Sequence, residues 1–158
     1  MIDQSGKTVW ITGASSGIGE ALAKTFVANG GSAVLSGRNL AELQRVADET
    51  GAAERCLILP FDTQDFACLP AMVDKALNFQ GQVDVLVNNA GISQRSLAVE
   101  TDFAVYERIV GVDLLAPIAL TQALLPHLLA RGAGQLVMNT GVARKTVVPL
   151  LSPFCGAN

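Results

Sequence analysis

A glycine-rich turn near the start of the chain constrains its fold more than any other feature. Residues 12–19 read TGASSGIG, between a short apolar run at residues 7–12 and a helical pattern. Such a tight turn needs residues without a Cβ, and the helix beginning there presents free N–H groups and positive dipole to an anion. Between a strand and a helix, this loop is typical of pyrophosphate binding. The predicted contacts are Gly13, Ser15, Ser16, Gly17, Ile18 and Gly19.

Short apolar runs alternate with helical patterns along the whole chain. Strands are predicted at residues 7–12, 32–36, 56–60, 83–87 and 135–139. Helices are predicted from Ile18, from the residue after a cap at Asn39, from about residue 70, and over most of residues 101–131. Within the last of these, Pro117 and Pro126 are expected to start or bend segments. This alternation predicts an α/β fold with a doubly wound parallel sheet. Together with the glycine-rich loop it indicates the Rossmann type, for which the expected strand order is 3-2-1-4-5.

Composition narrows the function classes. The 158 residues suit one domain, half of them are hydrophobic, and the net charge is -3 without a basic run, so neither nucleic acid nor a membrane surface is an expected partner. No apolar run approaches the roughly 18 residues of a membrane helix, and no signal peptide is recognisable. Cys56, Cys68 and Cys155 share no metal-binding spacing, so buried thiols, no metal site and a cytoplasmic location are expected.

The residue after the second predicted strand bears on cofactor choice. Residues 36–39 contain Arg38 and no Asp or Glu. A carboxylate at such a position would accept a hydrogen bond from the adenosine ribose 2′-hydroxyl, whereas a guanidinium can pair with a 2′-phosphate. Arg38 therefore favours NADP(H) over NAD(H). The alternative interpretation is a solvated surface arginine.

With the loop and residues 88–91 (NNAG) both identified, the chain resembles the short-chain dehydrogenase/reductase family over about residues 5–158. Residues 12–19 match the TGxxxGxG loop of that family. The resemblance implies that Asn89, Ala90 and Gly91 shape the cofactor site and that Asp62 contacts the adenine. It also implies an oxidoreductase acting on alcohol or carbonyl groups with NAD(P)(H).

The catalytic pattern of the family is not preserved. Family members use a Tyr-x-x-x-Lys pair, a serine thirteen residues before the tyrosine, and an asparagine on the long helix. With Pro149 as a register mark, these positions fall on Phe154, Asn158, Gly141 and Asp113. Phe154 has no ionisable hydroxyl and Asn158 no cation, so little turnover is expected. Thr140 is adjacent to the serine position, but successive side chains of a strand point to opposite faces, so it is not expected to replace the serine. Ser152, His127 and Cys155 are not expected to replace the missing groups either.

Family members continue beyond residue 158 with two more strands and a loop that closes over the substrate, so this domain is expected to be C-terminally incomplete. A damaged gene, a deliberately cut chain and an unreliable terminal sequence would all give this pattern. The fifth strand would then be an uncovered edge, which predicts a homo-oligomer. Three functions stay open: an NADP-binding reductase-type domain of doubtful activity, a non-catalytic dinucleotide-binding module that senses the cofactor or pairs with an intact homologue, and an inert structural fragment.

Overall fold

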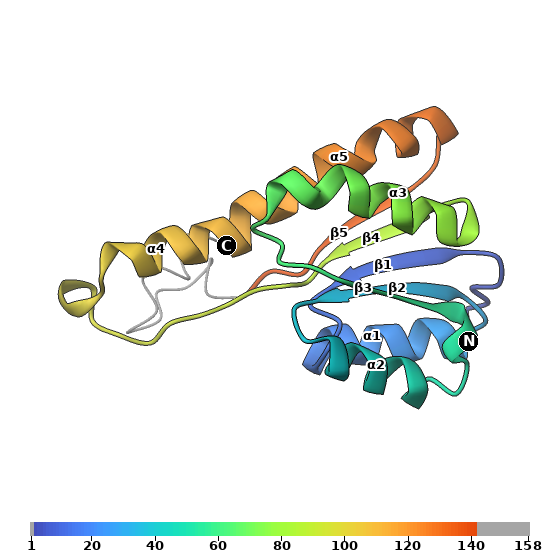
Figure 1. Ribbon diagram of the computed structural model, residues 1–158, viewed down its shortest axis with the longest axis horizontal. Coiled ribbons are helices and arrows are strands. Elements are labelled where there is room, and N and C mark those ends of the chain that lie inside the picture. Colours follow the sequence, from blue (N-terminus) through green and yellow to red (C-terminus); the bar gives the residue numbers. More distant parts are fainter. Residues whose placement is uncertain (1, 142–158) are drawn as a thin grey trace.

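The computed structural model describes residues 2–141. Five parallel strands form one sheet in the order β3-β2-β1-β4-β5. Figure 1 shows α1 and α2 on one face of this sheet and α3 and α5 on the other. The predicted doubly wound sheet and its strand order are confirmed. In chain order the elements are β1 (Thr8–Thr12), α1 (Gly17–Ala28), β2 (Ser32–Gly37), α2 (Leu40–Glu49), β3 (Cys56–Pro60), α3 (Leu69–Gln80), β4 (Val85–Asn88), α4 (Phe103–Val110), the π-helical turn η4 (Gly111–Leu115), α5 (Ala116–Arg131) and β5 (Gln135–Met138), with short 3-10 turns η1 (Ala53–Arg55), η2 (Phe66–Cys68) and η3 (Ala98–Glu100).

Local signals located most element boundaries to within two residues. The Asn39 side chain accepts a hydrogen bond from the backbone N–H of Glu42 at 3.3 Å, as a helix cap should. Pro117 lies in the first turn of α5, directly after the π-helical turn η4, so the expected segment start coincides with a change of helical geometry and not with a break. Pro126, by contrast, lies inside α5 without ending it. The fourth strand begins at Val85, two residues later than predicted, although Val83 is buried in the core.

Alternate residues of the central strands build two separate cores. Ile11, Leu35 and Val87 pack beneath α1 and α2, together with Val27 and Leu43 from those helices. Trp10, Val34 and Leu86 are their neighbours in sequence and point to the other face. There they pack against apolar side chains of α3 and α5, including Val73, Ala76, Leu120 and Leu124. Burial on both faces explains why these strands read as continuous apolar runs.

The helical stretch Phe103–Arg131 runs through α4, η4 and α5 without a break. By length and composition this stretch could cross a membrane, and the mean hydropathy of its most apolar window is 1.7. The expectation that no apolar segment approaches the length of a membrane helix is therefore wrong. A single helix of this kind is weak support for a membrane span, because core helices of soluble proteins pass the same test of length and composition. In this helix 33% of the most apolar window is buried. The predictions of a cytoplasmic location and of no membrane partner stay predictions.

Candidate functional site

A cleft of about 530 Å³ lies at the carboxyl ends of the strands. Its walls come from the loops that follow all five strands, and it spans the junction of β1 with β4. At this junction the chain connections diverge to opposite sides of the sheet, which is the usual ligand position in doubly wound folds. Nine of the eleven predicted cofactor residues line the cleft, namely Gly13, Ser15, Ser16, Ile18, Arg38, Asp62, Asn89, Ala90 and Gly91.

The two motifs are joined by the side chain of Thr12, the last residue of β1. Its hydroxyl oxygen accepts hydrogen bonds from the backbone N–H groups of Asn89 and Ala90, both at 3.0 Å. The Asn89 side-chain amide in turn donates to the carbonyl oxygens of Thr12 at 2.9 Å and Gly13 at 3.2 Å. These contacts hold the glycine-rich loop against the NNAG segment. The position of each loop therefore depends on the other.

The glycines of the loop serve different purposes. A Cβ on Gly19 would lie 2.3 Å from the carbonyl oxygen of Gly13, and a Cβ on Gly13 would lie 2.9 Å from the Cα of Ala90. Both positions therefore require glycine for close packing. Gly17 has open space around its Cα but a φ of +58°, a conformation that L side chains rarely adopt. Gly17 and Gly19 are the two predicted residues that do not line the cleft, and they act through the shape of the loop.

Arg38 follows β2 at the edge of the cleft. It also lines an open hollow with Asn39, Leu40, Ala41 and Gln44 at the start of α2. Within residues 2–141 its guanidinium makes no ion pair or hydrogen bond. The charge is therefore available to an anionic ligand. Asp62, which follows β3, also lines the cleft, and its Oδ1 accepts a hydrogen bond from the backbone N–H of Gln64 at 3.0 Å.

Two of the four aligned catalytic positions lie in the described part of the chain, and both line the cleft. Asp113 lies in η4, and its Oδ1 accepts a hydrogen bond from the backbone N–H of Ile92 at 2.9 Å. Such π-helical turns within longer helices are frequent at functional sites. Gly141 contributes no side chain. Phe154 and Asn158 lie outside the described residues, as do Ser152 and Cys155.

The expectation that Thr140 points away from the cleft is wrong, because it requires residues 140 and 141 to continue the strand. β5 ends at Met138, however, so residues 140 and 141 lie beyond the strand, and both line the cleft. Thr140, which carries a hydroxyl, therefore lines the cleft next to Gly141, the position at which the family serine is expected.

Other titratable candidates lie elsewhere. His127 is on α5, outside the cleft, and burial lowers its pKa, with the charge of Arg131 as a smaller cause. Cys56 and Cys68 are partly exposed rather than buried, and desolvation raises the pKa of both thiols. None of these groups has the position or the pKa of a nucleophile acting in the cleft.

The sequence-based site omitted Thr12, Asn88 and Asn139. Thr12 and Asn88 belong to the two motifs, so the signal that identified the motifs could have included them. The side-chain amide of Asn88 donates to the Thr121 hydroxyl oxygen at 3.2 Å, and Asn139 donates to the Asn89 Oδ1 at 2.7 Å. No local pattern marks Asn139. Its role follows only from the pairing of β4 with β5.

Comparison with known proteins agrees with this geometry. A family model described as short chain dehydrogenase matches residues 7–157. The chain is 39% identical over 154 residues to human dehydrogenase/reductase SDR family member 7, covering 94% of this chain and 45% of that protein. It is 40% identical over 156 residues to an SDR family protein 7-like dehydrogenase/reductase of Anopheles gambiae, covering 95% and 49%. The chain thus spans about half the length of the curated relatives it matches.

Solved structures give the same result. A short-chain dehydrogenase from Streptomyces avermitilis superimposes with a TM-score of 0.91 at 29% identity, covering 99% of this chain and 57% of that one. A metagenomic short-chain oxidoreductase solved in complex with NADP also gives 0.91 at 29% identity, covering 97% and 70%. Together with the strand order and the two joined motifs, these similarities show that the chain belongs to the short-chain dehydrogenase/reductase family.

Proposed function

We propose that this chain binds NADP(H) in preference to NAD(H) across the cleft and that its own turnover is low or absent. The binding of a nicotinamide dinucleotide is a property of the family. The preference for the phosphorylated cofactor rests on one observation: Arg38 lines the cleft edge with no partner for its charge in residues 2–141. The similar oxidoreductase solved with NADP is consistent with this choice.

The residues fit such a cofactor. Gly13 and Gly19 allow the loop to pack closely against the NNAG segment, and Gly13, Ser15, Ser16 and Ile18 line the cleft at the start of α1, where a pyrophosphate would bind. Arg38 and Asp62 stand on the side of β2 and β3, and Asp113, Thr140 and Gly141 on the side of β4 and β5. The adenosine half would bind the first group and the nicotinamide half would face the second.

A bound nicotinamide would exchange a hydride with an alcohol or carbonyl group, and the protein would have to hold the substrate oxygen and move its proton. Gly141 offers no side-chain hydroxyl to that oxygen. Asp113 already uses one carboxylate oxygen to accept from Ile92, and a carboxylate cannot donate as an amide would. Thr140 can donate a hydrogen bond but is a weak acid. The described residues thus support binding and orientation better than proton transfer.

The test is a pair of measurements on the same purified chain. Fluorescence titration with NADPH and NADH should give saturable binding that is several-fold tighter for NADPH. Steady-state assays with aldehydes, ketones and quinones should give no NADPH oxidation above a heat-treated control. Absence of dinucleotide binding would refute the proposal and would favour an inert structural fragment.

A second candidate is a non-catalytic module that senses the dinucleotide or pairs with an intact homologue. The glycine at position 141 favours it, because a binding module needs no hydrogen-bond donor to a substrate oxygen there. Binding without turnover would support this candidate. Turnover of any carbonyl substrate would refute it.

A further inference from the structure

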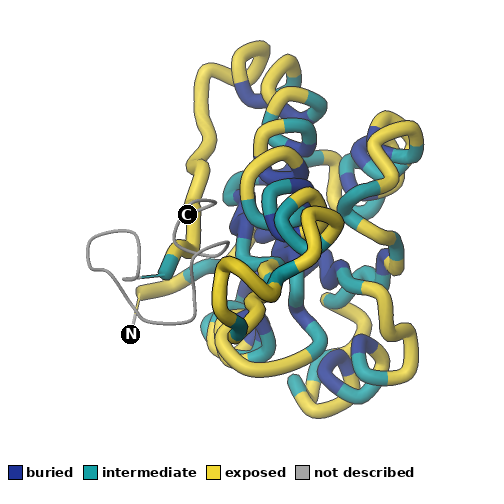
Figure 2. The backbone as a smooth tube through the Cα atoms, turned by 90° about the vertical axis from the view of Figure 1, so that its left-hand side faces the viewer, coloured by how far each residue is buried: buried dark blue, intermediate teal, exposed yellow. Residues whose placement is uncertain are grey.

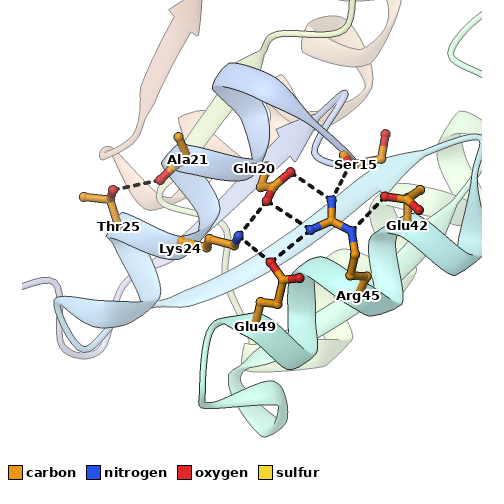
Figure 3. Close-up of polar contacts among 8 residues, drawn as sticks. All are labelled: Ser15, Glu20, Ala21, Lys24, Thr25, Glu42, Arg45 and Glu49. Atoms are coloured by element: carbon orange, nitrogen blue, oxygen red, sulfur yellow. Dashed lines mark hydrogen bonds and ion pairs between the residues drawn. The ribbon is translucent and has the colours of Figure 1, made fainter.

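Five charged side chains connect the first turns of α1 to α2, as Figure 3 shows. Arg45 of α2 lies at their centre. Its Nε donates to Glu42 at 2.8 Å, its first terminal nitrogen to Glu49 at 2.9 Å and Glu20 at 3.1 Å, and its second to Glu20 at 2.9 Å. Lys24 of α1 bridges Glu20 and Glu49, each at 2.6 Å. A network around a forked guanidinium is more ordered than an isolated surface ion pair.

Arg45 makes one contact that the rest of the network lacks. Its second terminal nitrogen also donates to the backbone carbonyl oxygen of Ser15 at 3.4 Å. Ser15 and Ser16 line the cleft, and Ser16 is the N-cap of α1. In a trans peptide unit the C=O and the following N–H point in opposite directions. A guanidinium on the Ser15 carbonyl therefore orients the N–H of Ser16 away from α2.

The same guanidinium also compensates a negative charge. Glu20 lies in the first turn of α1, close in sequence to the loop proposed to hold a pyrophosphate. Hydrogen bonds from Arg45 and then Lys24 lower the pKa of Glu20 to about 2, so its carboxylate is ionised at neutral pH. An uncompensated carboxylate there would repel the diphosphate. Both cations reduce this repulsion, but only Arg45 also reaches the loop.

We propose that Arg45 is a positioning residue for the dinucleotide: from outside the cleft, it holds the Ser15–Ser16 peptide unit in the orientation that receives the pyrophosphate. The inference rests on the proposed binding of NADP(H). It adds Arg45, as a second arginine, to the residues on which that binding would depend. Arg38 would select the 2′-phosphate, whereas Arg45 would act on the pyrophosphate shared by NADPH and NADH.

The experiment compares Arg45→Gln with Lys24→Gln in the full chain. Each substitution removes one positive charge from the same network, but only Arg45→Gln removes the contact to Ser15. We expect Arg45→Gln to weaken NADPH and NADH alike by about fivefold or more, and Lys24→Gln to change either by less than about twofold. Adenosine 2′-monophosphate has no pyrophosphate, so its affinity should stay within about twofold in both variants. Should Arg45→Gln fail to fold by circular dichroism, Arg45→Lys, with one donor nitrogen in place of three, replaces it.

Equal losses in the two variants would mean that charge alone matters, and would overturn the role of the Ser15 contact. A matching loss for adenosine 2′-monophosphate would point to general disturbance of the domain and would overturn it as well. If the unmodified chain binds NADPH and Arg45→Gln binds it equally well, only this inference fails. If the unmodified chain binds no dinucleotide, the proposed function fails with it.

Discussion

The proposed preference for NADP(H) rests on Arg38. If its guanidinium meets a 2′-phosphate, NADPH should bind several-fold more tightly than NADH, and Arg38→Asp should reverse that order, because the carboxylate would repel the phosphate and accept from a ribose hydroxyl. Arg55→Asp is a matched control, since Arg55 is exposed in η1 and outside the cleft. Isothermal titration with both cofactors measures the ratio. Equal affinities in the starting protein, unchanged by Arg38→Asp, would contradict the assignment.

The phosphate loop depends on the left-handed backbone of Gly17. Gly17→Val should abolish dinucleotide binding while leaving far-UV circular dichroism nearly unchanged, because a β-branched residue at φ +58° must shift the loop. Close approach of the cofactor to the backbone is a second reason why a side chain is not expected to be tolerated there. Gly51→Val is the control, because Gly51 has a φ of +72° and equally open surroundings after α2.

Both glycine variants should lose a similar amount of stability, roughly 1–2 kcal/mol in chemical unfolding, since each forces an L side chain into the left-handed region. Only Gly17→Val should also lose NADPH binding. Retained binding in that variant would mean that the loop is not the cradle of the pyrophosphate.

Between elements, the Thr12 hydroxyl is the main polar link from β1 to the segment after β4. Thr12→Val keeps the shape but leaves the backbone N–H groups of Asn89 and Ala90 without their acceptor. We expect a loss of about 1 kcal/mol in the free energy of unfolding, because the two N–H groups are part-buried and water can partly replace the lost acceptor. Thr12→Ser retains the oxygen and should lose clearly less. Urea unfolding of both variants checks this, and equal losses would assign the effect to the methyl group instead.

Across the chain as a whole, β5 is the exposed edge of the described sheet. Leu136, Val137 and Met138 are 44%, 41% and 50% exposed, and Figure 2 shows the adjoining run of residues 131–140 in the colour of exposed residues. Edges of this kind pair with other chains. We propose self-association through residues 135–139 or the Phe103–Arg131 helical stretch, where Leu129 is 69% exposed.

Sedimentation at rising concentration should show a dimer or larger species. Leu129→Lys should weaken it if the helical stretch forms the contact, and Leu40→Lys on α2, at a residue 57% exposed, should leave it unchanged. A clean monomer at high concentration would contradict self-association altogether.

Catalysis should be absent from the unmodified chain. Without a phenol at position 154 and a cation at position 158, a developing alkoxide has no matched proton donor near neutral pH. The double substitution Phe154→Tyr with Asn158→Lys should recover little activity, because Gly141 and Asp113 would still occupy the other two positions. NADPH-dependent carbonyl reduction, measured after rigorous removal of host reductases, tests both statements. Turnover in the unmodified chain would direct attention first to Thr140, which lines the cleft.

Much of the fold could be predicted from the sequence because its signals are local. The apolar runs, the glycines and the Asn39 cap each act within a few residues, and they located the five strands and the phosphate loop before any contact was known. Strand–helix alternation indicated that the strands are parallel, and the glycine-rich loop indicated the Rossmann order that the sheet has. Nine of the eleven predicted cofactor residues line one cleft because strand ends of a parallel sheet meet at one edge.

Contacts between distant segments required the folded chain. Thr12 and Asn89 are 77 residues apart, Asn89 and Asn139 are 50 apart, and Arg45 reaches Ser15 across 30 residues. The position of Thr140 depended on where the pairing of β4 with β5 ends, which no local pattern records. Sequence periodicity reports which face of an element is apolar, whereas hydrogen bonds between loops depend on the packing of whole elements. The motifs were therefore readable in advance, and the network that holds them together was not.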